Sequence, residues 1–366
     1  MRDPRHEKLA KVLVNYSLGI RAGDKFVLRS SPAAAPLVRE VYREAIRAGA
    51  FPAVRLMIDG LSEIMLTEGS EEQLQFVSPI DKAEMEYFDA SMNIIADVNT
   101  KSLSGVDPQR MAMVGQARQP LMARYMERAA NDELHWNLTL YPTQAHAQDA
   151  GMSLAEYEDF VFGAGLLDEE DPVAAWRKVE TEQQKIADYL EGHDEIHIVA
   201  PGTDLTYRVG GRKWINACGT HNFPDGEVFT GPVEDSATGY VSFTYPAVYQ
   251  ANEVEGVRIE FESGKAVKAE ATRGGEFLNS MLDMDPGARY LGEVAFGLNY
   301  GITKFTRNIL FDEKIGGTMH MALGRSYPET GGTNESALHW DMIADLREGE
   351  VHADGELCYK GGKFTI

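Results

Sequence analysis

The sequence is poor in cysteine and in positive charge, and each shortage excludes a class of protein. Its 366 residues contain two cysteines, Cys218 and Cys358, too few and too far apart to indicate a disulfide framework. Lysine and arginine together number 35 against 57 aspartates and glutamates, which gives a formal net charge of −22. This balance excludes the basic surface that binds nucleic acid or an anionic membrane. It favours cationic partners instead, such as metal ions or substrates with a free ammonium group.

Other absences exclude further classes. No stretch approaches the roughly 20 apolar residues of a membrane span, and charges interrupt the first residues, MRDPRHEKLAKVLV, where a signal peptide would need an apolar run. We therefore expect a soluble, cytoplasmic protein with no nucleic-acid or membrane partner. The sequence has no P-loop, dinucleotide-binding, HExxH or Gly-x-Ser-x-Gly motif, so nothing local supports nucleotide binding or a serine nucleophile.

Helical and extended patterns alternate through the first half of the chain. Apolar residues recur at helical spacing over residues 9–18 and 38–46, and residues 25–29 and 53–57 have the composition of strands. This order is typical of a parallel α/β layer. Further helices are predicted over residues 108–129, from Ser153 with its SLAE capping box, and over 172–190, and further strands over 90–98 and 135–140.

The pattern changes near Gly192, after which short extended runs alternate with Gly, Pro, Asn and Asp turns. The last residues, 351–366, have the pattern of a hairpin. We therefore predict an α/β protein with two domains. The first is an N-terminal α/β domain with a parallel-type sheet over residues 1–191, and the second is a β-rich α+β domain over residues 192–366.

Two histidines lie in strand-like runs between residues 311 and 347. In the run ALHWDMI, the alternation of side chains places His339 and Asp341 on one face of the strand. In the run TMHMAL, His320 occupies the face opposite the two methionines. A single strand histidine is more often a hydrogen-bonded core residue than a metal ligand. Two histidines with a same-face aspartate, on either side of the turn-rich segment GRSYPETGGTNE, favour a metal site.

Two glutamates in other strand-like runs are candidates for the same site. Glu227 follows a turn in DGEVFTGP, and Glu293 is the one charge in YLGEVAFGL. In the second run large apolar residues share one face, and small residues accompany Glu293 on the other. A carboxylate in such a position is costly unless it is paired or binds a metal. An exposed edge strand with a solvated glutamate is the alternative, because glutamate is usually exposed.

The candidate ligands are Glu227, Glu293, His320, His339 and Asp341. Together they offer more donor atoms than the roughly four that one zinc-like ion uses, which favours two ions with room for water or substrate. A structural zinc would more often use cysteine. One iron bound by the His-x-Asp pair and a second histidine, His320 or His352, would instead indicate an oxygenase. A non-catalytic binding module stabilised by metal is the third interpretation.

Four motifs resemble the M29 family of metallo-aminopeptidases, the aminopeptidase T/S group: GEVFTGP, YLGEVAFGLN, FDEKIGGTMHMALGRSYPETGG and SALHWDMIADLR. The similarity extends to LGIRAGDKFVL and APLVREVYREAIRAGA nearer the N-terminus. The family's five metal ligands match the five candidates above, and its active-site tyrosine matches Tyr327. The resemblance implies an N-terminal α/β domain, a β-rich catalytic domain and a homodimer. It also implies two divalent ions per chain, zinc or cobalt, with manganese or magnesium as alternatives.

The expected activity is removal of N-terminal residues from peptides with a free N-terminus, by a water that two metal ions activate. Glu293 is the candidate for proton transfer, with bridging of the two ions as its alternative role. The hydroxyl of Tyr327 can donate a hydrogen bond to the oxyanion of the tetrahedral intermediate. Lys304, Arg307 and Arg325 are candidates for binding a peptide carboxylate, although surface ion pairs are the commoner role of such residues.

Overall fold

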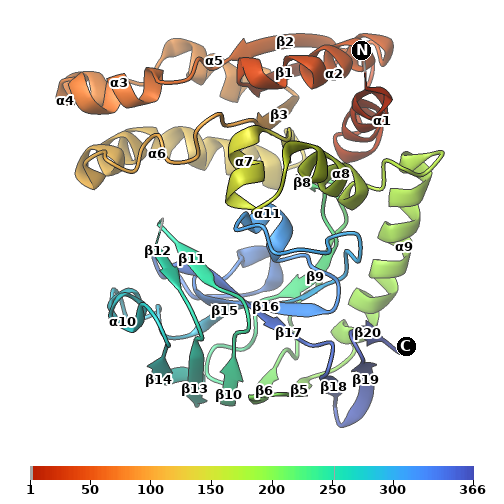
Figure 1. Ribbon diagram of the computed structural model, residues 1–366, viewed down its shortest axis with the longest axis vertical. Helices are drawn as coiled ribbons and strands as arrows, with labels where there is room; N and C mark the ends of the chain where they lie inside the picture. Colours follow the sequence, from red (N-terminus) through yellow and green to blue (C-terminus); the bar gives the residue numbers. More distant parts are fainter. Residues whose placement is uncertain (1–2, 251) are drawn as a thin grey trace. The chain divides into compact units, whose positions relative to one another are not determined.

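The computed structural model describes residues 3–250 and 252–366, which divide into two compact units. Both units contain helices and strands (Figure 1), and both contain buried apolar side chains. The first unit comprises the chain up to Trp176 together with Gly219–Pro224, and the second comprises Arg177–Cys218 and Asp225–Ile366.

Helix α9, Pro172–Glu191, begins in the first unit and continues into the second. Its later residues Ala187 and Leu190 belong to the buried core of the second unit. The predicted domains, residues 1–191 and 192–366, stay a prediction, because a compact unit is not by itself a domain that folds alone.

The first unit contains a five-stranded sheet. Its strand order is β2–β1–β3–β4–β8, and every neighbouring pair is parallel. The first four of these strands in sequence lie where the sequence patterns place them, so the predicted parallel α/β layer is confirmed. The strands are β1 Lys25–Ser30, β2 Phe51–Leu56, β3 Ala90–Ile95, β4 His135–Leu140 and β8 Asn222–Phe223.

The helices of the first unit follow the predicted pattern in part. The side chain of Ser153 accepts a hydrogen bond from the backbone N–H of Glu156, and the Glu156 carboxylate accepts one from the backbone N–H of Ser153, which completes the predicted capping box. Helices α3 to α5 were not predicted from the sequence, because each buries only one side chain and so has no apolar stripe. The helices are α1 Pro4–Val12, α2 Ala35–Arg47, α3 Leu61–Glu68, α4 Glu71–Leu74, α5 Pro79–Tyr87, α6 Pro108–Ala130, α7 Gln144–Asp149 and α8 Leu154–Ala164.

The second unit contains two larger antiparallel sheets and one strand pair. The eight-stranded sheet has the order β14–β13–β10–β6–β5–β18–β19–β20. Its strands are β5 Glu195–Ala200, β6 Thr203–Arg208, β10 Thr238–Ser242, β13 Arg258–Glu262, β14 Lys265–Glu270, β18 Glu350–Ala353, β19 Glu356–Lys360 and β20 Lys363–Phe364. Strands β18 and β19 form the hairpin predicted near the C-terminus.

The five-stranded antiparallel sheet of the second unit, here called the ligand sheet, has the order β17–β16–β15–β9–β7. Its strands are β7 Ile215–Ala217, β9 Glu227–Thr230, β15 Leu291–Gly297, β16 Thr318–Gly324 and β17 His339–Asp345. The remaining elements are the pair β11 Ala247–Tyr249 and β12 Asn252–Val254, and the helices α10 Gly275–Leu282 and α11 Ile309–Asp312.

One core joins the two sheets of the second unit. The eight-stranded sheet contributes residues such as Ile198 and Phe261, and the ligand sheet contributes Phe296, Met321 and Met342, all nearly inaccessible to solvent. Burial of these side chains supplies the main favourable term for folding of the unit. Since side chains alternate along a strand, the residues between them project from the opposite face of the ligand sheet.

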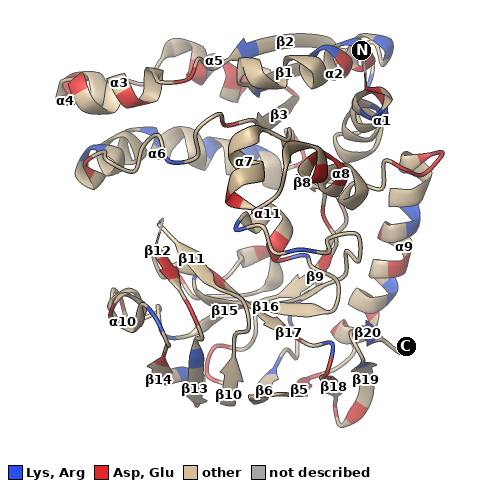
Figure 2. Ribbon diagram, viewed as in Figure 1, with Lys and Arg blue, Asp and Glu red and all other residues tan. Residues whose placement is uncertain are grey.

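Both cysteines are buried and carry free thiols. Acidic residues occur on elements of both units (Figure 2), as expected from the net charge. Among the residues that the structure describes, no helix combines the length and the apolar character that a bilayer crossing requires.

Candidate metal centre

The five predicted ligands project from the ligand sheet on the face opposite the core. Ala322 of β16 pairs in register with both Glu293 and Asp341, on the strands to either side. Across the sheet, Glu227 pairs with Gly297. Small residues at these cross-strand positions leave room for long polar side chains beside them. The ligands come from four neighbouring strands: Glu227 from β9, Glu293 from β15, His320 from β16, and His339 and Asp341 from β17.

Glu293 lies between the two imidazoles. Its Oε1 is 3.3 Å from Nε2 of His320, and its Oε2 is 3.3 Å from Nε2 of His339. Oδ1 of Asp341 is 3.9 Å from the same atom of His320 and 3.5 Å from that of His339. Oε2 of Glu227 is 3.6 Å from Nδ1 of His320. All five side chains thus lie in one cluster.

Backbone carbonyls orient both histidines. Nδ1 of His320 donates to the carbonyl oxygen of Glu313 at 3.1 Å, and Nδ1 of His339 donates to that of Arg325 at 2.9 Å. Each ring therefore turns Nε2 toward Glu293 and Asp341, while Glu227 lies on the Nδ1 side of His320. This arrangement is common in metal-binding histidines, because the hydrogen bond at one nitrogen fixes which nitrogen is free to bind.

Two groups of three side chains offer ligand atoms within 4.8 Å of one another. The first is Glu293, His339 and Asp341, and the second is Glu313, His320 and Asp341. Asp341 belongs to both groups. Carboxylate and imidazole donors of this kind suit divalent ions such as zinc, cobalt or manganese.

Two buried oxygens of the cluster support a metal on independent grounds. Within residues 3–250 and 252–366, no hydrogen-bond donor reaches Oε2 of Glu227 or Oδ1 of Asp341. Buried polar atoms in folded proteins nearly always have a partner, and an unpaired carboxylate oxygen is costly. Both oxygens lie beside the histidines, so a cation bound there would satisfy them.

The protonation of the cluster departs from ordinary values. Burial alone would raise the pKa of Glu293, but hydrogen bonds with His320 and His339 outweigh it and lower the pKa to about 2. Burial alone would lower the pKa of each histidine, but the neighbouring carboxylates raise it to about 10 for His320 and about 9 for His339. Burial raises the pKa of Asp341 to about 6 and that of Glu227 well above its usual value. The cluster thus contains more carboxylates than positively charged groups that could pair with them.

Tyr327 lies at the rim of the cluster. Its ring packs edge-on against His339, with the ring centroids 5.2 Å apart, and it also contacts the ring of Phe229. The side chain remains 39% exposed. Burial and the nearby carboxylates, Glu293 first among them, raise its pKa, so the hydroxyl keeps its proton and can donate a hydrogen bond.

Sequence reasoning missed three charged residues of the cluster. Glu313 belongs to the second ligand group, Lys314 is buried beside it, and Asp225 lies two residues before Glu227. Glu313 and Lys314 stand in the DEK run just before strand β16. That run of adjacent charges, directly upstream of a histidine-bearing strand, was the available signal.

The other residues considered in the sequence do not place a side chain in the cluster, although the backbone carbonyl of Arg325 orients His339. His352 is on β18 of the eight-stranded sheet, paired in register with His197. Arg307 forms an ion pair with Glu253, and the guanidinium of Arg325 donates to the carbonyl of Ser336. Lys304 is exposed.

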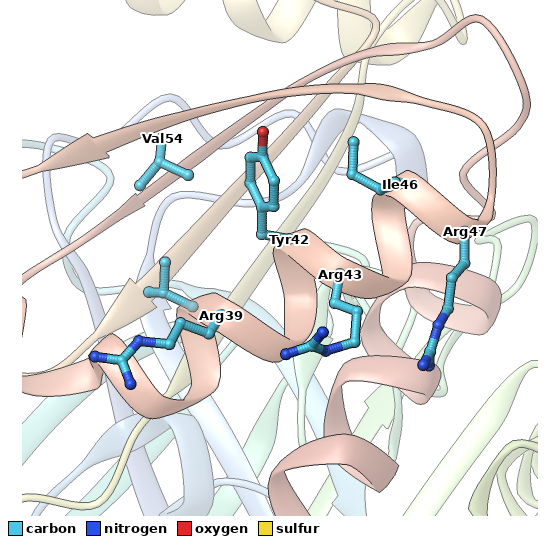
Figure 3. A pocket seen from close by; sticks show the side chains of 7 residues that line it. Arg39, Tyr42, Arg43, Ile46, Arg47 and Val54 are labelled. Carbon is cyan, nitrogen blue, oxygen red and sulfur yellow. The ribbon is translucent and has the colours of Figure 1, made fainter.

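A hollow of about 560 Å³ occurs in the first unit, between α2 and β2 (Figure 3). Apolar side chains and arginines line it, with no carboxylate or histidine among them: Val38, Arg39, Tyr42, Arg43, Ile46, Arg47 and Val54. It therefore lacks the donors that the cluster on the ligand sheet provides.

Comparisons with known proteins agree with the chemistry of the cluster. The family model for M29, thermophilic metalloprotease, matches residues 2–364. Aminopeptidase 2 of Geobacillus stearothermophilus is 31% identical over 98% of this chain and 97% of its own length. Aminopeptidase T of Thermus thermophilus is 28% identical over 98% of this chain and 96% of its own length.

Two solved structures have a similar fold. Wild-type AmpT from Thermus thermophilus has a TM-score of 0.85 at 25% identity, with 99% of each chain covered. The 2,5-dihydroxypyridine dioxygenase of Pseudomonas putida KT2440 has a TM-score of 0.57 at 14% identity, over 99% of this chain and 96% of that one, and shares the fold alone. Since the match runs through the whole chain, this protein belongs to the M29 family of metalloproteases and is a metallo-aminopeptidase.

Proposed function

We propose that this enzyme removes N-terminal residues from peptides with two divalent metal ions bound on the ligand sheet. The observation that carries the proposal is the pair of ligand groups that share Asp341. One ion would be held by Glu293, His339 and Asp341, and the other by Glu227, Glu313, His320 and the shared aspartate. When bound, such ions supply Lewis-acid polarisation of the scissile carbonyl and acidify a water molecule.

The charge of the cluster supports two ions rather than one. Five carboxylates carry five negative charges and Lys314 carries one positive charge, which leaves four negative charges when both histidines are neutral. Two divalent cations would neutralise them. The five carboxylates are those of Asp225, Glu227, Glu293, Glu313 and Asp341.

Glu293 and Tyr327 are the proposed catalytic residues. The two oxygens of Glu293 face two different histidines, so this carboxylate would lie beside both ions, where it could help to hold them or accept a proton from the water. The hydroxyl of Tyr327, at the rim beside His339, would donate to the oxyanion that develops on the substrate. Negative charge around the site would also attract the free ammonium group of a peptide N-terminus.

The remaining proposals rest on the family resemblance and on composition. We propose zinc or cobalt as the ions, with manganese or magnesium as alternatives, because the donor set suits each of them. We also propose a cytoplasmic homodimer, in keeping with two buried free thiols that suit a reducing compartment. Light scattering of the purified protein tests the dimer.

Elemental analysis combined with a screen of aminoacyl substrates tests the function. We expect about two ions per chain, release of free N-terminal amino acids, and loss of activity with a chelator that returns when metal is added. N-terminally acetylated versions of the same peptides are the matched control, and they should resist cleavage. Cleavage of the acetylated peptides at the same rate would contradict the proposal.

The oxygenase interpretation is the second candidate. His320, His339 and Asp341 do form a two-histidine, one-carboxylate set. Two further carboxylates, Glu227 and Glu293, lie in direct contact with these histidines, however, and a single iron would not need them. One iron per chain with oxygen-dependent turnover would favour the oxygenase.

A further inference from the structure

Lys314 is a buried ammonium within the proposed metal centre. Among the lysines of residues 3–250 and 252–366 it alone is buried, with no exposed surface. Its Nζ forms an ion pair with Glu313 and lies 3.5 Å from Oε1 of Glu227 and 3.9 Å from Oδ1 of Asp225. A buried charge is costly unless its partners are well placed, so an ammonium at this point calls for a role.

The backbone fixes Lys314 in place. Its N–H donates to the carbonyl of Phe311 at 3.0 Å, and its own carbonyl accepts from the N–H of Asn299 at 3.0 Å. The side chain of Asn299 donates to the carbonyl of Asp225 at 2.7 Å, which ties the same residue to the segment before Glu227. Gly297 permits this packing, because a Cβ there would lie 2.3 Å from the carbonyl oxygen of the residue after Lys314.

The two oxygens of Glu227 face different groups. Oε1 faces the ammonium of Lys314, while Oε2 lies 3.6 Å from His320 and receives no hydrogen bond from any described residue. The buried side chain of Gln183 donates to the backbone carbonyl of Glu227 at 3.1 Å, so the residue is held at its backbone as well. One oxygen of the carboxylate thus faces the ammonium of Lys314, and the other faces the side of the site where the histidines lie.

We propose that Lys314 is a positioning residue of the metal centre, which occupies Oε1 of Glu227 so that Oε2 alone is presented to a metal ion. The inference rests on the proposed two-ion function. The alternative is that Lys314 only neutralises part of the negative charge of the cluster and does not orient Glu227. The two roles predict opposite effects on metal affinity. Loss of a positive charge beside a cation site tightens cation binding because it removes a Coulomb repulsion, whereas loss of a positioning partner weakens it.

Cobalt titration of metal-free full-length protein separates the two roles. Calorimetry gives affinity and stoichiometry, and the visible absorption of Co²⁺ reports the coordination of each ion. We expect the wild type to bind two ions, and Lys314→Met to bind one of them about tenfold to a hundredfold more weakly, as for other residues that orient metal ligands. Lys265→Met, at an exposed lysine on β14, is the control and should match the wild type. Equal or tighter binding by Lys314→Met would overturn the proposal.

A double-mutant cycle tests whether Lys314 acts through Glu227. In a Glu227→Gln background, Lys314→Met should change cobalt affinity by less than about twofold, because the carboxylate that it orients has gone. A further tenfold loss in that background would overturn the proposal. Far-UV circular dichroism of the metal-free variants checks that each is folded.

A crystal structure of the metal-loaded wild type decides the question even if Lys314→Met does not fold. The proposal expects Glu227 to bind metal through one oxygen, with the other within hydrogen-bond distance of Lys314. Coordination by both oxygens, or a Lys314 turned away, overturns it. A wild type that binds no cobalt would overturn the proposed function and this inference together, whereas two bound ions with an unchanged Lys314→Met would overturn only the role of Lys314.

Discussion

The two faces of the ligand sheet are made from alternate residues of the same strands, yet they have opposite chemistry. On β16, Met319 and Met321 enter the core, and His320 between them belongs to the polar cluster. On β17, Trp340 and Met342 enter the core on either side of Asp341. Burial of the apolar face thus fixes the strands in place, and the same strands position the residues of the polar face. Stability and chemistry should therefore be separable by substitutions one residue apart.

His320→Ala should produce the largest effect on the polar face. We expect peptidase activity to fall by on the order of 10³-fold or more with the fold intact, because a ligand of the catalytic ions is lost. Glu227→Gln and Asp341→Asn should act in the same way. Steady-state kinetics with added metal, beside thermal unfolding of the metal-free proteins, checks this. Near wild-type turnover in any of the three would remove that residue from the site.

Met321→Ala is the matched change on the apolar face, one residue along the strand. The side chain is completely buried, so its truncation should lower the free energy of unfolding by about 2–5 kcal/mol. Folded, metal-loaded protein should retain its activity per active site. Denaturant titration and kinetics below the unfolding transition give both quantities. A variant that kept its stability and lost its activity would contradict the division between faces.

Tyr327→Phe should sharpen the comparison at the rim of the polar face. Removal of one donor to an oxyanion typically costs roughly 3 kcal/mol of barrier, or about 100-fold in kcat. KM should change little, since the bond forms in the transition state. An unchanged kcat would exclude Tyr327 from catalysis.

The polar face should also make the stability of the metal-free protein depend on pH, because it contains the titratable histidines His320 and His339. The pKa values of His320, about 10, and His339, about 9, exceed the ordinary value of 6.5. Their stabilising contribution is therefore complete below about pH 6.5 and is lost as pH rises through 9 to 10. Asp341, with a pKa of about 6, is mostly ionised at pH 6.5 and fully ionised by pH 9. Melting temperatures between pH 6.5 and 10 should fall without metal and hold with it. A flat metal-free profile would contradict these shifts.

His352→Ala should have the smallest effect. This histidine lies on the eight-stranded sheet, so activity and the number of bound ions should stay within about twofold of the wild type, as for most changes away from a site. Loss of one metal ion in this variant would revive the oxygenase interpretation. Kinetics and metal analysis of His352→Ala, measured under the same conditions as for His320→Ala, provide the comparison.

The sequence predicted most of the polar face, because the alternation of side chains along a strand is regular. The runs around Glu293, His320 and His339 show which residues share a face, and the structure places them so. Glu313 and Lys314 follow the short helix α11 in an irregular segment, where no periodicity indicates direction. Strand β8 has two residues, too few for a pattern, so its place in the first unit's parallel sheet was not predicted.

Strand β15 contains a register shift between Leu291 and Glu293, which lie on opposite faces although they are two positions apart in the strand. In a regular strand, two residues at this spacing would point to the same face. Gly292 makes the shift feasible, since a Cβ there would lie 2.2 Å from the carbonyl oxygen of Arg325. Gly292 is the extra residue of the bulge, so its deletion would leave Leu291 and Glu293 opposite Leu323 and Ala322 and on opposite faces. Deletion of a residue from the regular part of β15 would instead exchange the two faces beyond that point, so this strand tolerates a change of length at one position and not at its neighbours.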